Sequence, residues 1–154
     1  MVFRNSACRI LGSLALGACL AASSRAALWT VDDNAQDFPG ADFSEIQTAI
    51  DAAASGDEIA VYPGVYVEAF VLKGKNLHLH SIAPADATIV ATTVINAGQA
   101  GPVLLLDSTV TSATLIEGFT MTGGASFNGG GIRGDGTTAT IRCFTGSAAT
   151  SRRS

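Results

Sequence analysis

After Gly56 the sequence breaks into seven short apolar segments, most of them bounded by turn residues. Short runs of β-branched and aromatic residues between Gly, Pro and Asn are typical of strands. No segment beyond Gly56 has the 3.6-residue apolar period of a helix, so we do not expect the helical crossovers of an ordinary parallel α/β sheet. Two all-β architectures fit, an antiparallel sandwich and a coiled parallel solenoid. The segments are IAVY, VYVEAFVL, LHLHSI, TIVATTVI, VLLL, TLIEGFTM and TATIRCF.

Two approximate internal repeats favour the solenoid. Phe119-Thr120 aligns with Phe144-Thr145, and Ser81 aligns with Ser108. Each of these spacings is close to the length of one coil of three short strands and three turns, which is about 25 residues. We therefore expect residues 57–146 to form stacked coils.

One segment before Gly56 does have the period of a helix. Asp42 suits the N-cap, Glu45 completes a capping-box pattern, and Gly56 suits the left-handed residue that ends many helices. We expect an amphipathic helix over 42–56 that covers other elements, because about three turns are too few to be stable alone. Its apolar stripe consists of Ile46, Ala49, Ile50 and Ala53.

The segment 1–26 has the layout of a secretory signal peptide. Arg4 and Arg9 precede an apolar run over 10–22, and small residues follow it. The run is shorter than the roughly 20 residues that span a bilayer, so we expect no membrane span in the mature chain. We expect a secreted or cell-surface protein. Two alternatives stay open: a retained anchor, and a lipoprotein modified at Cys19 within LGAC.

Charge and cysteine content exclude two kinds of site. Removing the signal also removes three arginines, so six basic residues (nine less three) face thirteen acidic ones. Nucleic-acid binding needs a clustered basic face, which this chain lacks. Cys143 is the one cysteine left in the mature chain, so neither a disulfide framework nor a paired-cysteine metal site can form.

The segment 27–41 is polar and rich in turn residues, and we expect a solvated entry loop. Five acids lie between Asp32 and Glu45, but their spacing lacks the alternating oxygen ligands and the glycine of an EF-hand loop.

The stretch from Asp42 to Ser81 closely resembles the N-terminal cap and first coils of right-handed parallel β-helix proteins of the pectin-lyase-like superfamily. GFTMTGG and NGGGIRG resemble repeat phrases of secreted bacterial members. The strong resemblance ends at Ser81, and a weaker one continues to about Gly146. It implies an amphipathic helix that plugs the open end of a β-helix, where strand edges and core would otherwise be exposed.

Within this stretch, Gly64-x-Tyr66-x-Glu68 resembles a motif of pectin methylesterases, which share the fold. The resemblance implies an aspartyl nucleophile, a second aspartate as acid/base, and glutamines, all in Gln-Asp and Asp-Phe phrases on later coils. Gln36-Asp37-Phe38 precedes the expected helix and cannot serve. The later aspartates lack the surrounding phrase, and they are Asp86, Asp107 and Asp135.

Two other patterns of the superfamily are also incomplete. The pectate-lyase set of calcium-binding acids with a catalytic arginine does not surround Arg133 or Arg142, and the Gly-His-Gly of polygalacturonases is missing. We predict no catalytic residue and no cofactor or metal. In the motif we expect Gly64 to make a turn, Tyr66 to pack or hydrogen-bond locally, and Glu68 to be solvated.

His78 and His80 alternate with leucines, so both should lie on one face of a strand. Our first interpretation is an exposed imidazole pair on the outer face. A weak metal site and a sugar-contacting pair are the alternatives, but spacing alone identifies no third protein ligand of the kind that catalytic zinc requires. With Tyr66 and Glu68, these histidines are the candidate ligand-contacting residues.

The C-terminal part contains no segment suited to covering a last coil. At roughly 25 residues each, 57–146 provide about four coils, and the polar segment 147–154 is expected to be disordered. The sequence therefore predicts an incomplete solenoid, either the start of a longer β-helix or a chain truncated or frame-shifted near Cys143. An unpaired edge around 140–146 predicts edge-to-edge self-association.

Taken together, these features predict an exported, non-catalytic β-helix module for surface structure, adhesion or glycan binding. Its expected partner is a polysaccharide or a cell-surface glycan. The alternative is a carbohydrate-active enzyme, a pectin-type esterase or a polysaccharide lyase, whose catalytic coils are missing or unrecognised.

Overall fold

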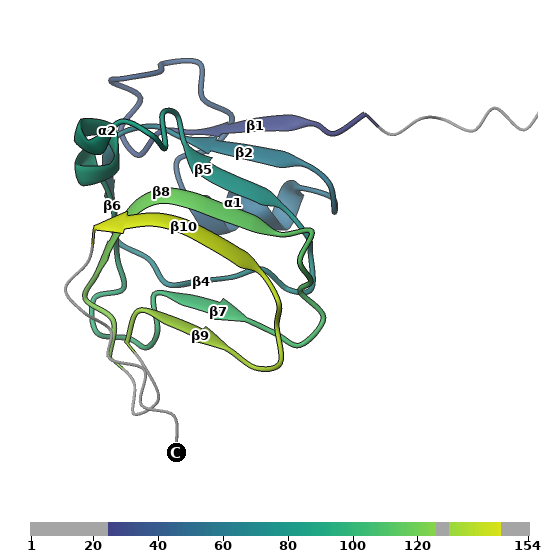
Figure 1. Cartoon of the computed structure of the whole chain (residues 1–154). Helices are drawn as coiled ribbons and strands as arrows, with labels where there is room; N and C mark the ends of the chain where they lie inside the picture. Colours follow the sequence, from purple (N-terminus) through teal and green to yellow (C-terminus); the bar gives the residue numbers. More distant parts are fainter. Residues whose placement is uncertain (1–24, 126–129, 146–154) are drawn as a thin grey trace, which may run out of the picture.

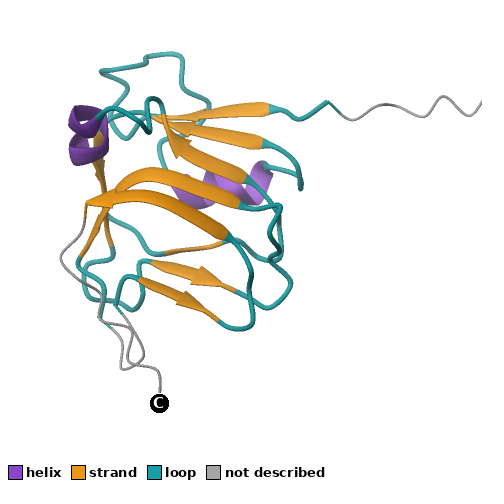
Figure 2. Cartoon of the chain, in the orientation of Figure 1, coloured by secondary structure: helices purple, strands orange, loops and turns teal. Residues whose placement is uncertain are grey.

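A computed structural model describes residues 25–125 and 130–145, with the backbone alone for 143–145. The described chain is mostly strand with two short helices (Figure 2). Neither helix has the length and apolar character that a membrane crossing requires. Nearly all of the expected signal peptide and all of the expected disordered tail lie outside the described residues.

The strands form two sheets in which every described pair runs parallel (Figure 1). In the larger sheet, β10 also pairs with β8. Its other strands follow the order β1 (Leu28–Val31), β2 (Glu58–Val61), β5 (His78–Ser81), β8 (Leu115–Thr122), β6 (Thr93–Asn96) and β3 (Gly64–Tyr66), and β10 covers Thr140–Thr145. The smaller sheet has the order β4 (Phe70–Val71), β7 (Leu104–Leu106) and β9 (Ile132–Gly134).

Parallel pairing decides one of the alternatives left open by the sequence. Strand β5 pairs parallel with both β2 and β8, which excludes the antiparallel sandwich. The repeat that aligns Phe119 with Phe144 is confirmed, because the two residues pair in register. The repeat that aligns Ser81 with Ser108 is wrong. Ser81 pairs with Val61 in the larger sheet, whereas Ser108 follows β7 of the smaller sheet.

Three local predictions differ from the structure. The first half of TIVATTVI forms α2 (Ala87–Thr92), because Asp86 caps it by accepting a hydrogen bond from the Thr88 amide. The expected entry loop contains β1, which pairs with β2 along its whole length. The glycine-rich region contains β9, which pairs with β7. Neither β1 nor β9 has a long apolar run, and each becomes a strand because a neighbour supplies its backbone partners.

The helix in the structure is shorter than the predicted 42–56. Helix α1 covers Ile46–Ala52, and Glu45 occupies the N-cap position without a side-chain cap bond. Asp42 is not the cap, since its carboxylate accepts bonds from the amide and hydroxyl of Thr30, at 3.0 and 2.8 Å. The apolar stripe is confirmed by burial of Ile46, Ala49, Ile50 and Ala53.

The core lies between the two sheets and α1, and it is built from rows of residues in register. Ile59 pairs with Leu79 and Leu79 with Ile116, and all three side chains are fully buried. Phe70 and Leu104 form a matching row in the smaller sheet. Successive side chains along a strand point to opposite faces of the sheet. The strand residues next to these core residues therefore point outward.

Helix α1 also completes one edge of β4, whose single strand partner in the described part of the chain is β7. The Gln47 amide group accepts from the Val71 amide at 2.9 Å and donates to the Val71 carbonyl at 3.3 Å. One side chain thus takes the place of a neighbouring strand at this residue, where unpaired backbone groups would be an aggregation hazard.

We predict that Ile50→Asp prevents folding. Ile50 is fully buried, and an unpaired buried carboxylate costs several kcal/mol in a domain whose whole stability is about 5–15 kcal/mol. Ala52→Asp is the matched control, because it places the same residue on the exposed side of the same helix and should cost about 1 kcal/mol or less. Circular dichroism with urea unfolding measures both. Equal loss in the two variants would contradict the core role of α1.

Candidate functional site

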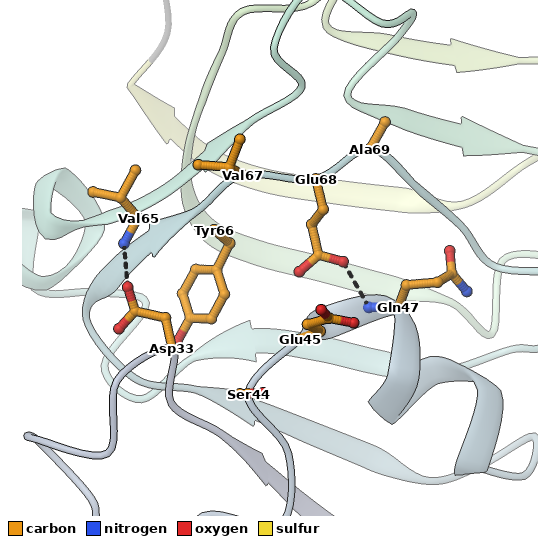
Figure 3. Close-up of a pocket in the computed structure, with 9 residues that line it drawn as sticks. All are labelled: Asp33, Ser44, Glu45, Gln47, Val65, Tyr66, Val67, Glu68 and Ala69. Atoms are coloured by element: carbon orange, nitrogen blue, oxygen red, sulfur yellow. Dashed lines mark hydrogen bonds between the residues drawn. The ribbon is translucent and has the colours of Figure 1, made fainter.

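The Gly64–Glu68 motif lies beside a pocket of about 470 Å³ (Figure 3). The pocket lies where the loop after β1, the start of α1 and the chain from β3 to β4 meet. Its walls carry three carboxylates and two exposed valines. The lining residues are Asp33, Ser44, Glu45, Gln47, Val65, Tyr66, Val67, Glu68 and Ala69.

Tyr66 lines the pocket but its polar group is already in use. The side chain is buried, and its hydroxyl is shared between the carbonyls of Tyr62 at 2.9 Å and Val31 at 3.2 Å. Burial raises the pKa of Tyr66, and the negative charge of Asp33 adds to the effect. Tyr66 therefore packs and hydrogen-bonds locally, as the sequence predicts, and its hydroxyl stays neutral over the physiological pH range.

Glu68 differs from the prediction, because it is engaged rather than solvated. Its carboxylate accepts from the amides of Ile46 at 2.8 Å and Gln47 at 2.9 Å, at the start of α1 (Figure 3 shows the bond to Gln47). The first amides of a helix have no partner within the helix, and the helix dipole favours a negative charge there. Glu68 is thus the N-terminal cap of α1, supplied from 22 residues downstream.

The other end of α1 is held in a similar way. The Lys75 ammonium donates to the carbonyls of Ile50 at 2.7 Å and Asp51 at 2.8 Å. Lys73 pairs with the Asp51 carboxylate at 2.8 Å. This hydrogen bond is the largest cause of the lowered pKa of Asp51, and a hydrogen bond from the Gln47 side chain is the next largest. A cation at the C-terminal carbonyls complements the helix dipole.

Asp33 explains the glycine of the motif. Its Oδ2 accepts from the Val65 amide at 3.0 Å, while Oδ1 is buried without a hydrogen-bond partner among the described residues. A Cβ at Gly64 would lie 2.5 Å from that Oδ1. The close approach of the Asp33 carboxylate therefore favours glycine at this position. Gly64 is the first residue of β3, so the prediction that it makes a turn is wrong.

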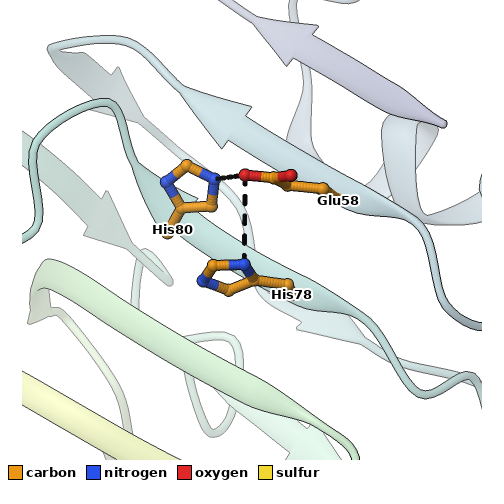
Figure 4. A group of neighbouring side chains, drawn as sticks. All are labelled: Glu58, His78 and His80. Atoms are coloured by element: carbon orange, nitrogen blue, oxygen red, sulfur yellow. Dashed lines mark hydrogen bonds and ion pairs between the residues drawn. The ribbon is translucent and has the colours of Figure 1, made fainter. Parts of the chain in front are cut away.

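The two histidines lie on the outer face of β5, as the alternation with buried leucines predicts. The centroids of their rings are 4.4 Å apart. Glu58 comes from β2 on one side and Glu117 from β8 on the other. His80 Nε2 lies 2.8 Å from Glu58 Oε1, and His78 Nε2 lies 3.0 Å from Glu117 Oε1 (Figure 4 shows Glu58 with the two rings).

Sequence reasoning missed both glutamates of this outer-face cluster, which we define as Glu58, His78, His80 and Glu117. Glu58 lies well before the histidines in the sequence and Glu117 well after them, so no local spacing connects the four residues. The structure pairs Glu58–Val61 with His78–Ser81 in register, which places Glu58 directly beside His78. A correct alignment of these two strands is the information that would have identified Glu58.

The chain matches no protein family, curated protein or solved structure. The resemblance of residues 42–81 to the pectin-lyase-like superfamily therefore stays a prediction from the sequence. What the chain can do has to be inferred from the pocket and the outer-face cluster.

We predict that Glu68→Ala destabilises the protein by about 2–3 kcal/mol, because two helix amides lose a charged acceptor. Glu68→Gln should cost less, since it keeps one acceptor oxygen. Glu45→Ala is the control. It removes an exposed carboxylate from the same pocket wall, and among the described residues this carboxylate bonds the Thr48 hydroxyl alone. Urea midpoints measure the series, and a Glu45 effect as large as that of Glu68 would contradict the capping role.

Proposed function

We propose that the described chain is a right-handed parallel β-helix that acts as an exported, non-catalytic module for surface structure, adhesion or glycan binding. The parallel pairing supports the coil, because a parallel partner needs a long connection and these connections carry the strands of the other faces. Strand β8 serves two faces. Its first residues (115–117) pair with β5 and its last residues (120–122) with β6, while β10 pairs with it over 115–120. The right hand follows the strong general preference of parallel crossovers.

One observation carries the non-catalytic assignment: most acidic side chains are occupied in holding the backbone. A hydrolase or lyase needs carboxylates free to exchange protons or attack a substrate. Here seven carboxylates accept hydrogen bonds from main-chain amides within the described residues. They are Asp32, Asp33, Asp42, Asp57, Glu68, Asp86 and Asp107.

Asp57 is the strongest example of this structural use. Its carboxylate accepts from the amides of Ala54 and Ala27 and from the Trp29 indole, at 2.8, 2.9 and 3.1 Å. Those bonds, with the Ala54 amide first, lower the pKa of Asp57 below its usual range. Such a group is a poor proton donor near neutral pH and joins the end of α1 to β1.

The pocket favours a neutral, hydroxyl-rich ligand over a polyuronate. Carboxylates of Asp33, Glu45 and Glu68 line it, and like charge opposes an anionic sugar chain. Carboxylate oxygens accept hydrogen bonds from sugar hydroxyls, while Val65 and Val67, both more than half exposed, offer apolar contact to a sugar ring. This electrostatic argument separates the proposal from a pectin-degrading enzyme.

We predict that the chain binds a neutral cello-oligosaccharide more tightly than polygalacturonate and turns over neither. Affinity electrophoresis and calorimetry measure binding. Unsaturated product from polygalacturonate, new reducing ends from either ligand, and methanol released from methyl-esterified pectin measure turnover. Val67→Arg should fill the pocket and abolish binding, whereas Ile82→Arg, at an exposed apolar residue outside it, should not. Turnover that disappears in an Asp33→Asn variant with wild-type circular dichroism would overturn the non-catalytic assignment.

Export rests on Arg4, Arg9 and the apolar run over 10–22. We predict a mature N-terminus near Ala27, which intact-mass and N-terminal peptide spectrometry would measure. A diacylglyceryl Cys19 would instead identify a lipoprotein. An intact Met1 recovered from the cytoplasm would contradict export in both forms.

A further inference from the structure

The hydrogen bonds of His80 leave one proton to be explained. Its Nδ1 lies 2.7 Å from the Ser81 carbonyl, which can only accept, so this nitrogen carries a hydrogen. In the neutral imidazole the other nitrogen, Nε2, then has a lone pair. That lone pair faces Glu58 Oε1 at 2.8 Å, and two acceptors do not approach so closely without a proton or another cation between them.

His78 is oriented in a complementary way. Its Nε2 lies 3.0 Å from the Glu117 carboxylate, which fixes a hydrogen on that nitrogen when Glu117 is ionised. The remaining nitrogen, Nδ1, presents its lone pair toward Glu58 Oε1 at 3.9 Å. Each ring therefore donates a hydrogen bond from one nitrogen, and its other nitrogen faces Glu58 Oε1 (Figure 4 shows the two rings with Glu58).

We propose that Glu58, His78 and His80 form a binding site for a divalent transition-metal ion, with Zn²⁺ as the best fit. One ligand atom from each residue lies within 4.8 Å of the others. Zn²⁺ bonds of about 2.0–2.1 Å place tetrahedral ligand atoms about 3.3 Å apart, and the observed 2.8 and 3.9 Å to Glu58 Oε1 lie on either side of that spacing.

The surroundings match what metal-bound histidines require. In such histidines the N–H of the second ring nitrogen donates a hydrogen bond to a carboxylate or a backbone carbonyl. This bond fixes the tautomer and the orientation of the ring. Glu117 has this role for His78, and the Ser81 carbonyl has it for His80. Glu117 is thus a positioning residue of the site and not a fourth ligand.

The ligand types decide which ion fits. Two imidazole nitrogens and one carboxylate oxygen suit Zn²⁺ and its transition-metal neighbours, whereas Ca²⁺ takes six to eight oxygens. Three protein ligands leave one position for water or an outside group. The His78 side chain is 37% exposed and that of Glu58 43%, so an ion can reach the site from solvent.

The backbone holds the ligands in place before an ion arrives. Glu58 and His78 are register partners on β2 and β5, and His80 follows on the same face of β5. Rigid strands make more precise sites than loops do. A bound ion would join β2 to β5 on the outer surface, independently of the pocket.

The test uses the tag-free mature chain, stripped with a chelator and titrated with Zn²⁺ by calorimetry at neutral pH. We expect one ion per chain. His80→Ala should weaken binding on the order of 100-fold, and Glu117→Ala about 10–100-fold through loss of ring orientation. Glu45→Ala, which removes an exposed carboxylate outside the cluster, should leave affinity unchanged. Circular dichroism must show that each variant is folded, and His80→Gln replaces His80→Ala if the alanine variant is not.

A second readout locates the ion. The chain has two histidines, so its imidazole NMR signals report on this cluster alone, and both should shift on titration with Zn²⁺. Cys143→Ser excludes binding through the thiol and should bind like the parent. Unchanged Zn²⁺ affinity in His80→Gln, or loss of binding in Cys143→Ser, would overturn the proposal. So would the absence of any Zn²⁺ uptake.

Discussion

Backbone hydrogen bonding between parallel strands is the constraint on which the described structure depends. Each described strand pairs with strands that are separated from it in the sequence by at least one other element, so a strand at the edge of a sheet has one side without a strand partner. At β4 the protein meets this need with Gln47, whose amide group bonds both polar groups of Val71. Next to that edge, Phe70 of β4 pairs in register with Leu104 of β7, and both side chains are buried.

The acidic residues show how the protein uses its excess negative charge. Glu68, Asp57 and Asp86 each accept hydrogen bonds from amides that begin or end an element and would otherwise lack partners. Charged acceptors of this kind are stronger than neutral ones. The carboxylates of the outer-face cluster differ from these, because Glu58 and Glu117 contact imidazole rings on the outer face of β5.

Features set by local pattern could be predicted from the sequence, and features set by distant partners could not. The buried stripe of α1 and the outward histidines follow from periods of 3.6 and 2, and the structure agrees with both. The prediction of Asp42 as the helix cap was wrong. Asp42 and Glu68 both suit the role by residue type, and only tertiary contact assigns it to Glu68. Strand β1 was missed because its partner β2 is distant in the sequence, beyond the whole of α1. Glu58 was missed for the same reason, since only strand pairing brings it beside the histidines.

The contacts that hold α1 in place have a consequence for the order of folding. Glu68 and Lys75 reach the two ends of the helix across only 21–25 residues of chain. Closing such short loops costs little entropy, and structures dominated by nearby contacts form quickly. The helix, its two charged clamps and the intervening strands can therefore assemble as soon as the chain up to Lys75 is free to fold. Later strands then add to strands of this first unit, β5 to β2, β6 to β3 and β7 to β4.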